Sequence, residues 1–204
     1  RLDFPNAWHH VFNRGNARKT VFFSESHYDY FIQLLETNAK DFNIKIHAFC
    51  LMKNHYHLLL HTPVGNLSKF MHSIGTKFGV RVNQDLNSEG PLFKSRFRSI
   101  LIDSEKYILQ LSRYIHLNPV EADYTSTPES YPWSSYTDYF YQRNDYNFLQ
   151  KEKILSYFRN NDEYHDYIKL GVDTQTKTTF ASKKVPPILG GKEFKSKLLN
   201  DLIQ

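Results

Sequence analysis

A tyrosine and an asparagine lie four positions apart in this chain, and two histidines flank another tyrosine upstream of them. Tyr114 and Asn118 fall in the run Ser-Arg-Tyr-Ile-His-Leu-Asn-Pro, and His55 and His57 fall in Lys-Asn-His-Tyr-His. Side chains two apart on a strand share a face, as do side chains four apart on a helix. If the two segments meet, a phenol lies beside two imidazoles and an amide oxygen. Such a set suits metal-assisted cleavage of a DNA strand by a tyrosine nucleophile.

Two imidazoles and one amide oxygen predict a site for Mg²⁺ or Mn²⁺, although Zn²⁺ or Co²⁺ could bind the same ligands. We expect His55, His57 and Asn118 to hold the metal, which would polarise the scissile phosphate. Tyr114 would attack the phosphorus, form a covalent phosphotyrosine and release a sugar hydroxyl. A phenol has an ordinary pKa of about 10, so this attack needs help from the metal or from a base. Because the bond energy is retained, the strand can be rejoined, which favours strand transfer over simple hydrolysis.

Each of these residues also has an ordinary structural interpretation. The His-x-His spacing arises easily by chance in a chain that contains 10 histidines. Tyr114 could be a core aromatic residue, and Asn118 could cap the end of a helix. Only the joint arrangement indicates a catalytic site. The other histidines of the predicted strands, His10 among them, are interpreted as structural.

Basic side chains near these segments predict a track for a nucleic-acid backbone. The net charge is +5, the pI is near 9.1 and aromatic residues make up 16% of the chain. Lysine and arginine bind phosphates, and aromatic rings stack on bases. Three of the basic residues alternate along a predicted strand and would share one of its faces. We expect DNA contacts from Arg14, Lys53, Lys94, Arg96, Arg98 and Arg113.

Other features exclude some classes of protein. A single cysteine, Cys50, cannot form an internal disulfide, which favours a reducing compartment. No apolar run approaches the roughly 18 residues of a membrane span, and no signal-peptide pattern is visible. We therefore expect a cytoplasmic, nucleoid-associated protein without a membrane partner.

The predicted elements must bring the two segments together. Their order is β-α-β-β-α-β followed by one more helix, which is the split βαβ order of a ferredoxin-like α+β fold with an antiparallel sheet. The last helix can lie across the sheet face that carries His55 and His57, and it should end before Pro119. The expected strands are 7–14, 44–52, 55–61 and 92–102, and the expected helices are about 24–42, 67–86 and 104–118.

The organisation changes in the last part of the chain. We predict one domain over residues 1–140 and a C-terminal extension of helices and linkers over residues 141–204, whose role the sequence leaves open. Within the extension, patterns favour a helix at 151–158, a polar linker at 174–187 and an amphipathic helix at 193–203.

Several motifs resemble those of the REP-associated tyrosine transposases. That family belongs with the single-tyrosine transposases of the insertion sequence 200/605 type, within the HUH superfamily of single-stranded DNA endonucleases. The resemblance covers roughly residues 5 to 140. The motifs are Trp-His-His-Val-Phe-Asn-Arg-Gly at 8–15, Met-Lys-Asn-His-Tyr-His-Leu-Leu at 52–59, Phe-Lys-Ser-Arg-Phe at 93–97 and Arg-Tyr-Ile-His-Leu-Asn-Pro-Val at 113–120.

The resemblance implies a metal-dependent endonuclease and strand transferase that acts on single-stranded DNA at imperfect hairpins of palindromic repeats. It places the nucleophile, which forms a 5′-phosphotyrosine and leaves a 3′-hydroxyl, on Tyr114. It places the metal ligands on His55, His57 and Asn118, the last at a position where related transposases have glutamine. It further implies a ferredoxin-like fold with an added catalytic helix, in a monomer or a homodimer.

Two alternatives to this function stay open. One is a non-catalytic protein that binds hairpin DNA or RNA on the same scaffold, in which case Tyr114→Phe would leave every activity intact. The other is a rolling-circle relaxase or replication initiator, which uses similar chemistry. Proteins of that second class tend to be larger, and this sequence has no P-loop pattern.

Overall fold

The computed structural model describes residues 2–103, 105–181, 188–191 and 194–196. A five-stranded sheet in the order β2-β3-β1-β4-β5 forms its centre, with β1 antiparallel to both neighbours, β2 antiparallel to β3, and β5 parallel to β4. The arrangement of the first four strands confirms the predicted ferredoxin-like α+β fold. The strands are β1 (Ala7–Arg14), β2 (Lys45–Met52), β3 (His55–Thr62), β4 (Arg98–Ile102) and β5 (Ile188–Leu189).

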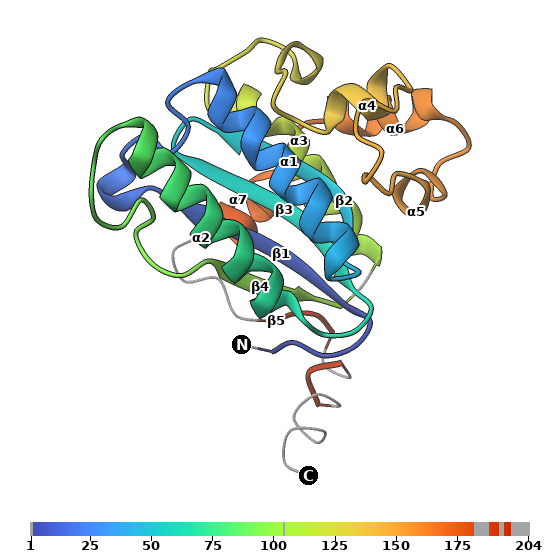
Figure 1. Ribbon diagram of the computed structural model, residues 1–204. Helices are drawn as coiled ribbons and strands as arrows, with labels where there is room; N and C mark the ends of the chain where they lie inside the picture. Colours follow the sequence, from blue (N-terminus) through green and yellow to red (C-terminus); the bar gives the residue numbers. More distant parts are fainter. Residues whose placement is uncertain (1, 104, 182–187, 192–193, 197–204) are drawn as a thin grey trace.

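Helices cover both faces of the sheet (Figure 1). The helices α1 (Glu25–Asp41) and α2 (Leu67–Asp85) pack on one face, and α3 (Glu105–Glu121) and α7 (Thr174–Ala181) lie behind the other. No helix of the described part is long and apolar enough to cross a membrane. The smaller helices are the 3₁₀ turns Asn16–Arg18 and Pro128–Ser130, then α4 (Tyr136–Phe140), α5 (Glu152–Leu155) and α6 (Asn161–Lys169).

Alternation along β3 separates the two faces of the sheet. The ring of Tyr56 lies 5.0 Å from that of Phe31 on α1, whereas the ring of His57 lies 5.3 Å from that of Tyr114 on α3. Successive side chains of a strand point to opposite faces, so His55 and His57 share the α3 side. The strand therefore places one set of residues in an apolar core and the other beside the tyrosine helix.

The end of β1 and the β2–β3 turn are held together. The amide of Gly15 donates to the carbonyl of Asn54 at 2.9 Å. A Cβ atom at Gly15 would lie 2.1 Å from the carbonyl oxygen of Lys19, so only glycine fits this close approach. The contact fixes the position of the turn that precedes His55.

The predicted strand at 92–102 is wrong for its first half. The observed strand β4 begins at Arg98, and residues 92–97 leave the sheet edge apart from an isolated bridge between Gly15 and Phe93. The side chain of Asn13 donates to the carbonyl of Ser95 at 3.1 Å in place of a continued ladder. Lys94 and Arg96 consequently lie in a loop, and the shared strand face predicted for them with Arg98 does not form.

The predicted end of the tyrosine helix at Asn118 is also wrong. Helix α3 continues through Pro119 to Glu121. Proline removes one backbone donor, but the turn beyond it still closes, because the amide of Ala122 donates to the carbonyl of Asn118 at 3.1 Å. Asn118 is thus a helical residue, and residue 104, where this helix was predicted to begin, lies outside the described residues.

The C-terminal predictions need one clear correction. Residues 174–181, predicted as part of a linker, form helix α7, which packs against α3. The buried residues Val172, Thr176 and Phe180 recur every four positions, as one face of a helix requires. The predicted helix at 151–158 shortens to α5, and most of the one at 193–203 lies outside the described residues, as do residues 182–187. The division at residue 140 stays a prediction.

Candidate active site

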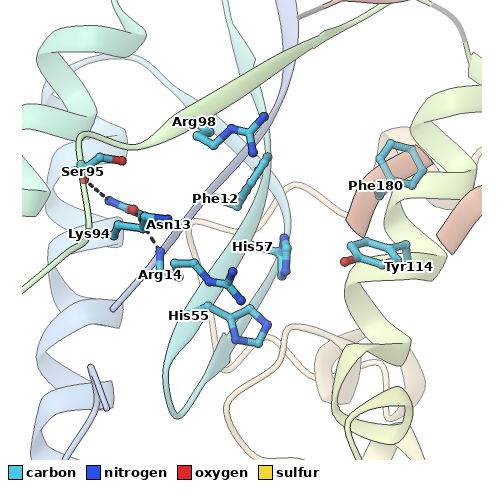
Figure 2. A pocket seen from close by; sticks show the side chains of 10 residues that line it. All are labelled: Phe12, Asn13, Arg14, His55, His57, Lys94, Ser95, Arg98, Tyr114 and Phe180. Atoms are coloured by element: carbon cyan, nitrogen blue, oxygen red, sulfur yellow. Dashed lines mark hydrogen bonds between the residues drawn. The ribbon is translucent and has the colours of Figure 1, made fainter. Parts of the chain in front are cut away.

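A cavity of about 410 Å³ opens between β1, β3, the loop at 94–95 and helix α3 (Figure 2). Its ten lining residues comprise the predicted nucleophile, two histidines, three basic residues, two phenylalanines and two small polar residues, and none of them is acidic. It therefore combines the predicted nucleophile with imidazoles and cations. We call it the Tyr114 cavity; its lining residues are Phe12, Asn13, Arg14, His55, His57, Lys94, Ser95, Arg98, Tyr114 and Phe180.

Tyr114 is held at the wall of this cavity by aromatic contacts. Its ring meets that of His57 edge to face at 5.3 Å and that of Phe180 at 5.5 Å, and its hydroxyl points toward the two histidines in Figure 2. Burial raises the pKa of Tyr114 to about 12, while a hydrogen bond with Asn118 acts in the opposite direction. The phenol is therefore protonated at neutral pH, and a nucleophilic role requires that its proton be removed during attack.

Asn54 and Asn118 present amide oxygens to the two ring nitrogens of His55. Burial lowers the pKa of His55, so the ring is neutral at pH 7 and carries one proton. The amide nitrogen of Asn54 donates to the carbonyl of Arg18 at 3.3 Å, which directs its Oδ1 atom to Nδ1 of His55 at 2.6 Å. Oδ1 of Asn118 lies 3.0 Å from Nε2 of the same ring, and since both amide oxygens only accept, a neutral His55 can donate to only one of them. The arrangement with the proton on Nδ1 leaves a lone pair on Nε2.

The two free donor atoms of His55 and Asn118 converge. Nε2 of His55 lies 3.0 Å from Oδ1 of Asn118, so two electron-pair donors face one another when the proton of His55 is on Nδ1. Adjacent ligands of an octahedral ion with bonds of about 2.1 Å lie about 3 Å apart. This spacing, together with neutral imidazoles, fits a divalent cation.

His57 supplies the third predicted ligand. Its ring is buried, its centroid lies 5.1 Å from that of His55, and burial holds its pKa well below the ordinary value. Its Nδ1 atom is 2.9 Å from Nε2 of His10, and when Nδ1 of His57 donates in this contact its Nε2 is available for a ligand. No group of three or more His, Cys, Asp or Glu residues suited to a metal occurs in the described part of the chain, so a metal here would depend on the mixed histidine and amide set.

The six predicted DNA-binding residues do not all meet. Arg14, Lys94 and Arg98 line the Tyr114 cavity, where the guanidinium of Arg98 lies 5.2 Å from the ring centre of Phe12. Arg96 lines an adjoining groove between α2 and the loop at 90–97, which shares Asn13, Lys94 and Ser95 with the Tyr114 cavity.

The two remaining basic residues lie elsewhere. Lys53 is exposed in the β2–β3 turn. Arg113 is buried, with its guanidinium 4.5 Å from the ring centre of Tyr167 and 3.4 Å from a carboxylate oxygen of Asp173. Neither is among the described residues that line the cavity. The contacts of Arg113 are therefore with the C-terminal helices.

Phe180 was not predicted as a site residue, because it lies in the stretch predicted to be a linker. The four-residue spacing of Val172, Thr176 and Phe180 was the available signal, and the threonine in the middle obscured it. His10 and Asn54 were also missed, since each acts on a candidate ligand and not on the cavity itself.

Comparison with known proteins identifies the family. The model of the IS200-like transposase family matches residues 4–118, which is more than half of the chain. The chain therefore belongs to the IS200-like transposases, as its motifs indicated. No curated protein sequence matches it.

Two solved structures resemble this one. A REP-associated tyrosine transposase, determined bound to a REP hairpin, aligns with a TM-score of 0.56 and 17% identity over 74% of this chain and 87% of that chain. A putative transposase from Deinococcus radiodurans R1 aligns with a TM-score of 0.41 and 20% identity over 56% of this chain and 92% of that chain. The first of these likenesses shows that the fold is that of a REP-associated tyrosine transposase.

Proposed function

We propose that this protein is a metal-dependent single-stranded DNA endonuclease and strand transferase that acts at DNA hairpins through a covalent 5′-phosphotyrosine. The observation that carries the proposal is the position of Tyr114 in one cavity with His55 and His57. Membership of the IS200-like transposases supports the same chemistry. We expect the reaction to occur in the cytoplasm on nucleoid DNA.

The lining of the cavity supports a phosphate as the group that enters it. Arg14, Lys94 and Arg98 supply positive charge, and no carboxylate of the lining opposes an anion. A hairpin partner is proposed by analogy with the REP-associated transposase whose structure contains one.

Tyr114 would act as the nucleophile. Its phenolic proton leaves, its oxygen bonds to phosphorus, and the bond from phosphorus to the 3′-oxygen breaks. One proton is lost from the phenol and one is gained by the released 3′-oxygen, which becomes a hydroxyl. A hydrogen bond with Asn118 lowers the pKa of Tyr114 and so favours the ionised phenol that attacks.

His55, His57 and Asn118 would hold Mg²⁺ or Mn²⁺. When bound, such an ion supplies charge stabilisation at the scissile phosphate. Burial keeps both imidazoles neutral at pH 7, so neither has to lose a proton before it can ligate a cation. The ring of His57 also packs edge to face against the ring of Tyr114.

The geometry supports a site that one chain can complete. Tyr114 and both histidines of the same chain line one cavity, so no second copy is required to bring a tyrosine to the histidines. We therefore favour a monomer as the active unit over a homodimer that exchanges tyrosine helices.

A covalent-trapping assay tests this function. Labelled single-stranded hairpin DNA is incubated with the protein and Mn²⁺ or Mg²⁺ and then run on a denaturing gel, with and without chelator. A labelled protein band that disappears in Tyr114→Phe, in His57→Ala and with chelator supports the proposal. Tyr107→Phe, on the same helix, is the matched control and should retain the band. Tight hairpin binding with no band across a panel of hairpins would favour the non-catalytic alternative.

A further inference from the structure

His10 lies directly beneath the candidate metal ligand His57. It is fully buried in β1, and its Nε2 atom is 2.9 Å from Nδ1 of His57. Its ring also meets the ring of Phe180 at 5.5 Å and that of Tyr114 at 6.1 Å, both edge to face. One imidazole thus contacts the candidate nucleophile, a candidate ligand and the helix that covers them.

The partner of His57 differs in kind from the partner of His55. Asn54 and Asn118 present amide oxygens to His55, and such oxygens can only accept. His10 presents an imidazole nitrogen, which can donate or accept. The contact between His10 and His57 is therefore compatible with two arrangements of protons.

Only one of the two arrangements leaves His57 able to bind a cation. If Nε2 of His10 donates, the proton of His57 lies on Nε2, where a ligand would have to bind. If Nδ1 of His57 donates, its Nε2 keeps a lone pair, and the proton of His10 must lie on Nδ1. Nδ1 of His10 is buried and has no hydrogen-bond partner among the described residues. This atom is unpaired in both arrangements, as an N–H in the one that binds a cation and as a lone pair in the other.

We propose that His10 is a positioning residue that sets the tautomer and the ring orientation of His57, and thereby the affinity of the site for a divalent cation. The inference rests on the proposed function, because it assigns His57 as a ligand. Groups that hold the far nitrogen of a ligating histidine commonly change metal affinity about 10- to 100-fold. The structure supplies that group here as a second histidine in place of a carboxylate or a carbonyl.

Mn²⁺ titration of the DNA-free protein, followed by electron paramagnetic resonance, tests the inference. His10→Phe keeps a ring between Tyr114 and Phe180 but removes the acceptor, and it should weaken Mn²⁺ binding about 10- to 100-fold. His10→Gln offers an amide oxygen near the position of Nε2 and should restore most of the affinity. His47→Phe, which alters another buried histidine of the sheet, is the matched control and should bind as the wild type does.

Two outcomes overturn the inference. One is a His10→Phe protein that binds Mn²⁺ like the wild type, and the other is a folded His10→Gln protein that binds as weakly as His10→Phe. Hairpin affinity in chelator should be the same in all variants, since a purely structural defect would lower it. A wild type that does not bind Mn²⁺ would overturn the proposed metal site as well, so failure of the function and failure of the inference alone are distinguishable.

If His10→Phe does not fold, the tautomers of His10 and His57 in the wild-type protein still test the inference. Long-range ¹⁵N–¹H correlation spectra report which nitrogen of each imidazole carries the proton. In the presence of saturating Mg²⁺, we expect the proton of His57 and that of His10 to lie on Nδ1 in both rings. A proton on Nε2 of His10 under these conditions would contradict the inference.

Discussion

The two faces of the central sheet differ in what they bury. Against α1 and α2, the rings of Phe22, Phe31, Tyr56 and Phe78 pack together with centroid distances near 5 Å. Against α3 and α7, the same strands bury imidazoles, which are joined by the contacts described above. Apolar burial needs only complementary shape, whereas a buried polar group is costly unless it has a partner.

Because of this difference, we expect the α1 and α2 face to contribute mainly to folding stability and the α3 and α7 face mainly to the proposed reaction. Substitutions on the α1 and α2 face should lower the free energy of unfolding and leave the site groups in place. Substitutions on the α3 face should lower DNA cleavage or ligand binding and change the free energy of unfolding less than substitutions on the α1 and α2 face do. The effects below, from the largest to the smallest, test this separation.

The largest effect is expected at the nucleophile. Tyr114→Phe removes only the hydroxyl, so the covalent protein–DNA product should fall at least about a thousandfold. The ring contacts with His57 and Phe180 remain, and the melting temperature should change little. Quantified gel bands together with thermal denaturation make the comparison. A fall in activity that is matched by a fall in stability would contradict the separation.

The second prediction concerns the apolar face. Phe31→Ala removes a fully buried ring that contacts Phe22, Tyr56 and Phe78, and it should lower the free energy of unfolding by about 3–5 kcal/mol. Urea denaturation measures this loss. Phe23→Ala, at a ring that is 47% exposed, is the matched control and should cost far less. At a temperature where Phe31→Ala is still folded, covalent trapping should be close to that of the wild type.

Acid should destabilise the protein through its buried imidazoles. Burial lowers the pKa of His10 and of His116 to about 3 and that of His47 to about 4. Below the unfolded value of 6.5, the unfolded chain binds more protons than the folded chain. Stability that is present above pH 6.5 is therefore lost as the pH falls, by up to about 1.4 kcal/mol per pH unit for each such histidine. Urea denaturation between pH 7.5 and 4.5 checks this, and a constant free energy of unfolding across the range would refute it.

The smallest effect is expected from single basic residues. Arg98→Gln removes a cation from the Tyr114 cavity and should reduce the slope of log affinity against log salt by about 1. Arg96→Gln, in the adjoining groove beside α2 and outside the Tyr114 cavity, is the matched variant and should have a weaker effect on the same hairpin. Fluorescence anisotropy at several salt concentrations measures both. Equal effects would show that the phosphate track runs through both cavities.

The regular elements of the domain were predictable because their patterns are strong. The alternation in 55–61 and the helical spacing of Phe70, Met71, Ile74 and Phe78 gave elements within a residue or two of those observed. The prediction failed where a side-chain contact competes with a backbone pattern. The side chain of Asn13 donates to the carbonyl of Ser95 where the backbone ladder between β1 and residues 92–97 was expected to continue. Helix α3 continues through Pro119, where its end was expected.

The candidate site was predictable only in part. The spacings of His55 with His57 and of Tyr114 with Asn118 each predict a shared face, and the structure brings the two faces together. The hydrogen bonds that orient the imidazoles were not predictable, because Asn54 and His10 make them through atoms whose direction depends on the folded turn and sheet.

By itself, the sequence determined which side chains share a strand face or a helix face, because these periods are properties of the backbone. It also determined the family, through motifs at 8–15, 52–59, 93–97 and 113–120. Only the tertiary structure decided that Phe180 closes the Tyr114 cavity and that Arg113 turns to Tyr167. These contacts join residues more than 50 positions apart, and a contact at that separation depends on how helices dock on the sheet and not on any local pattern.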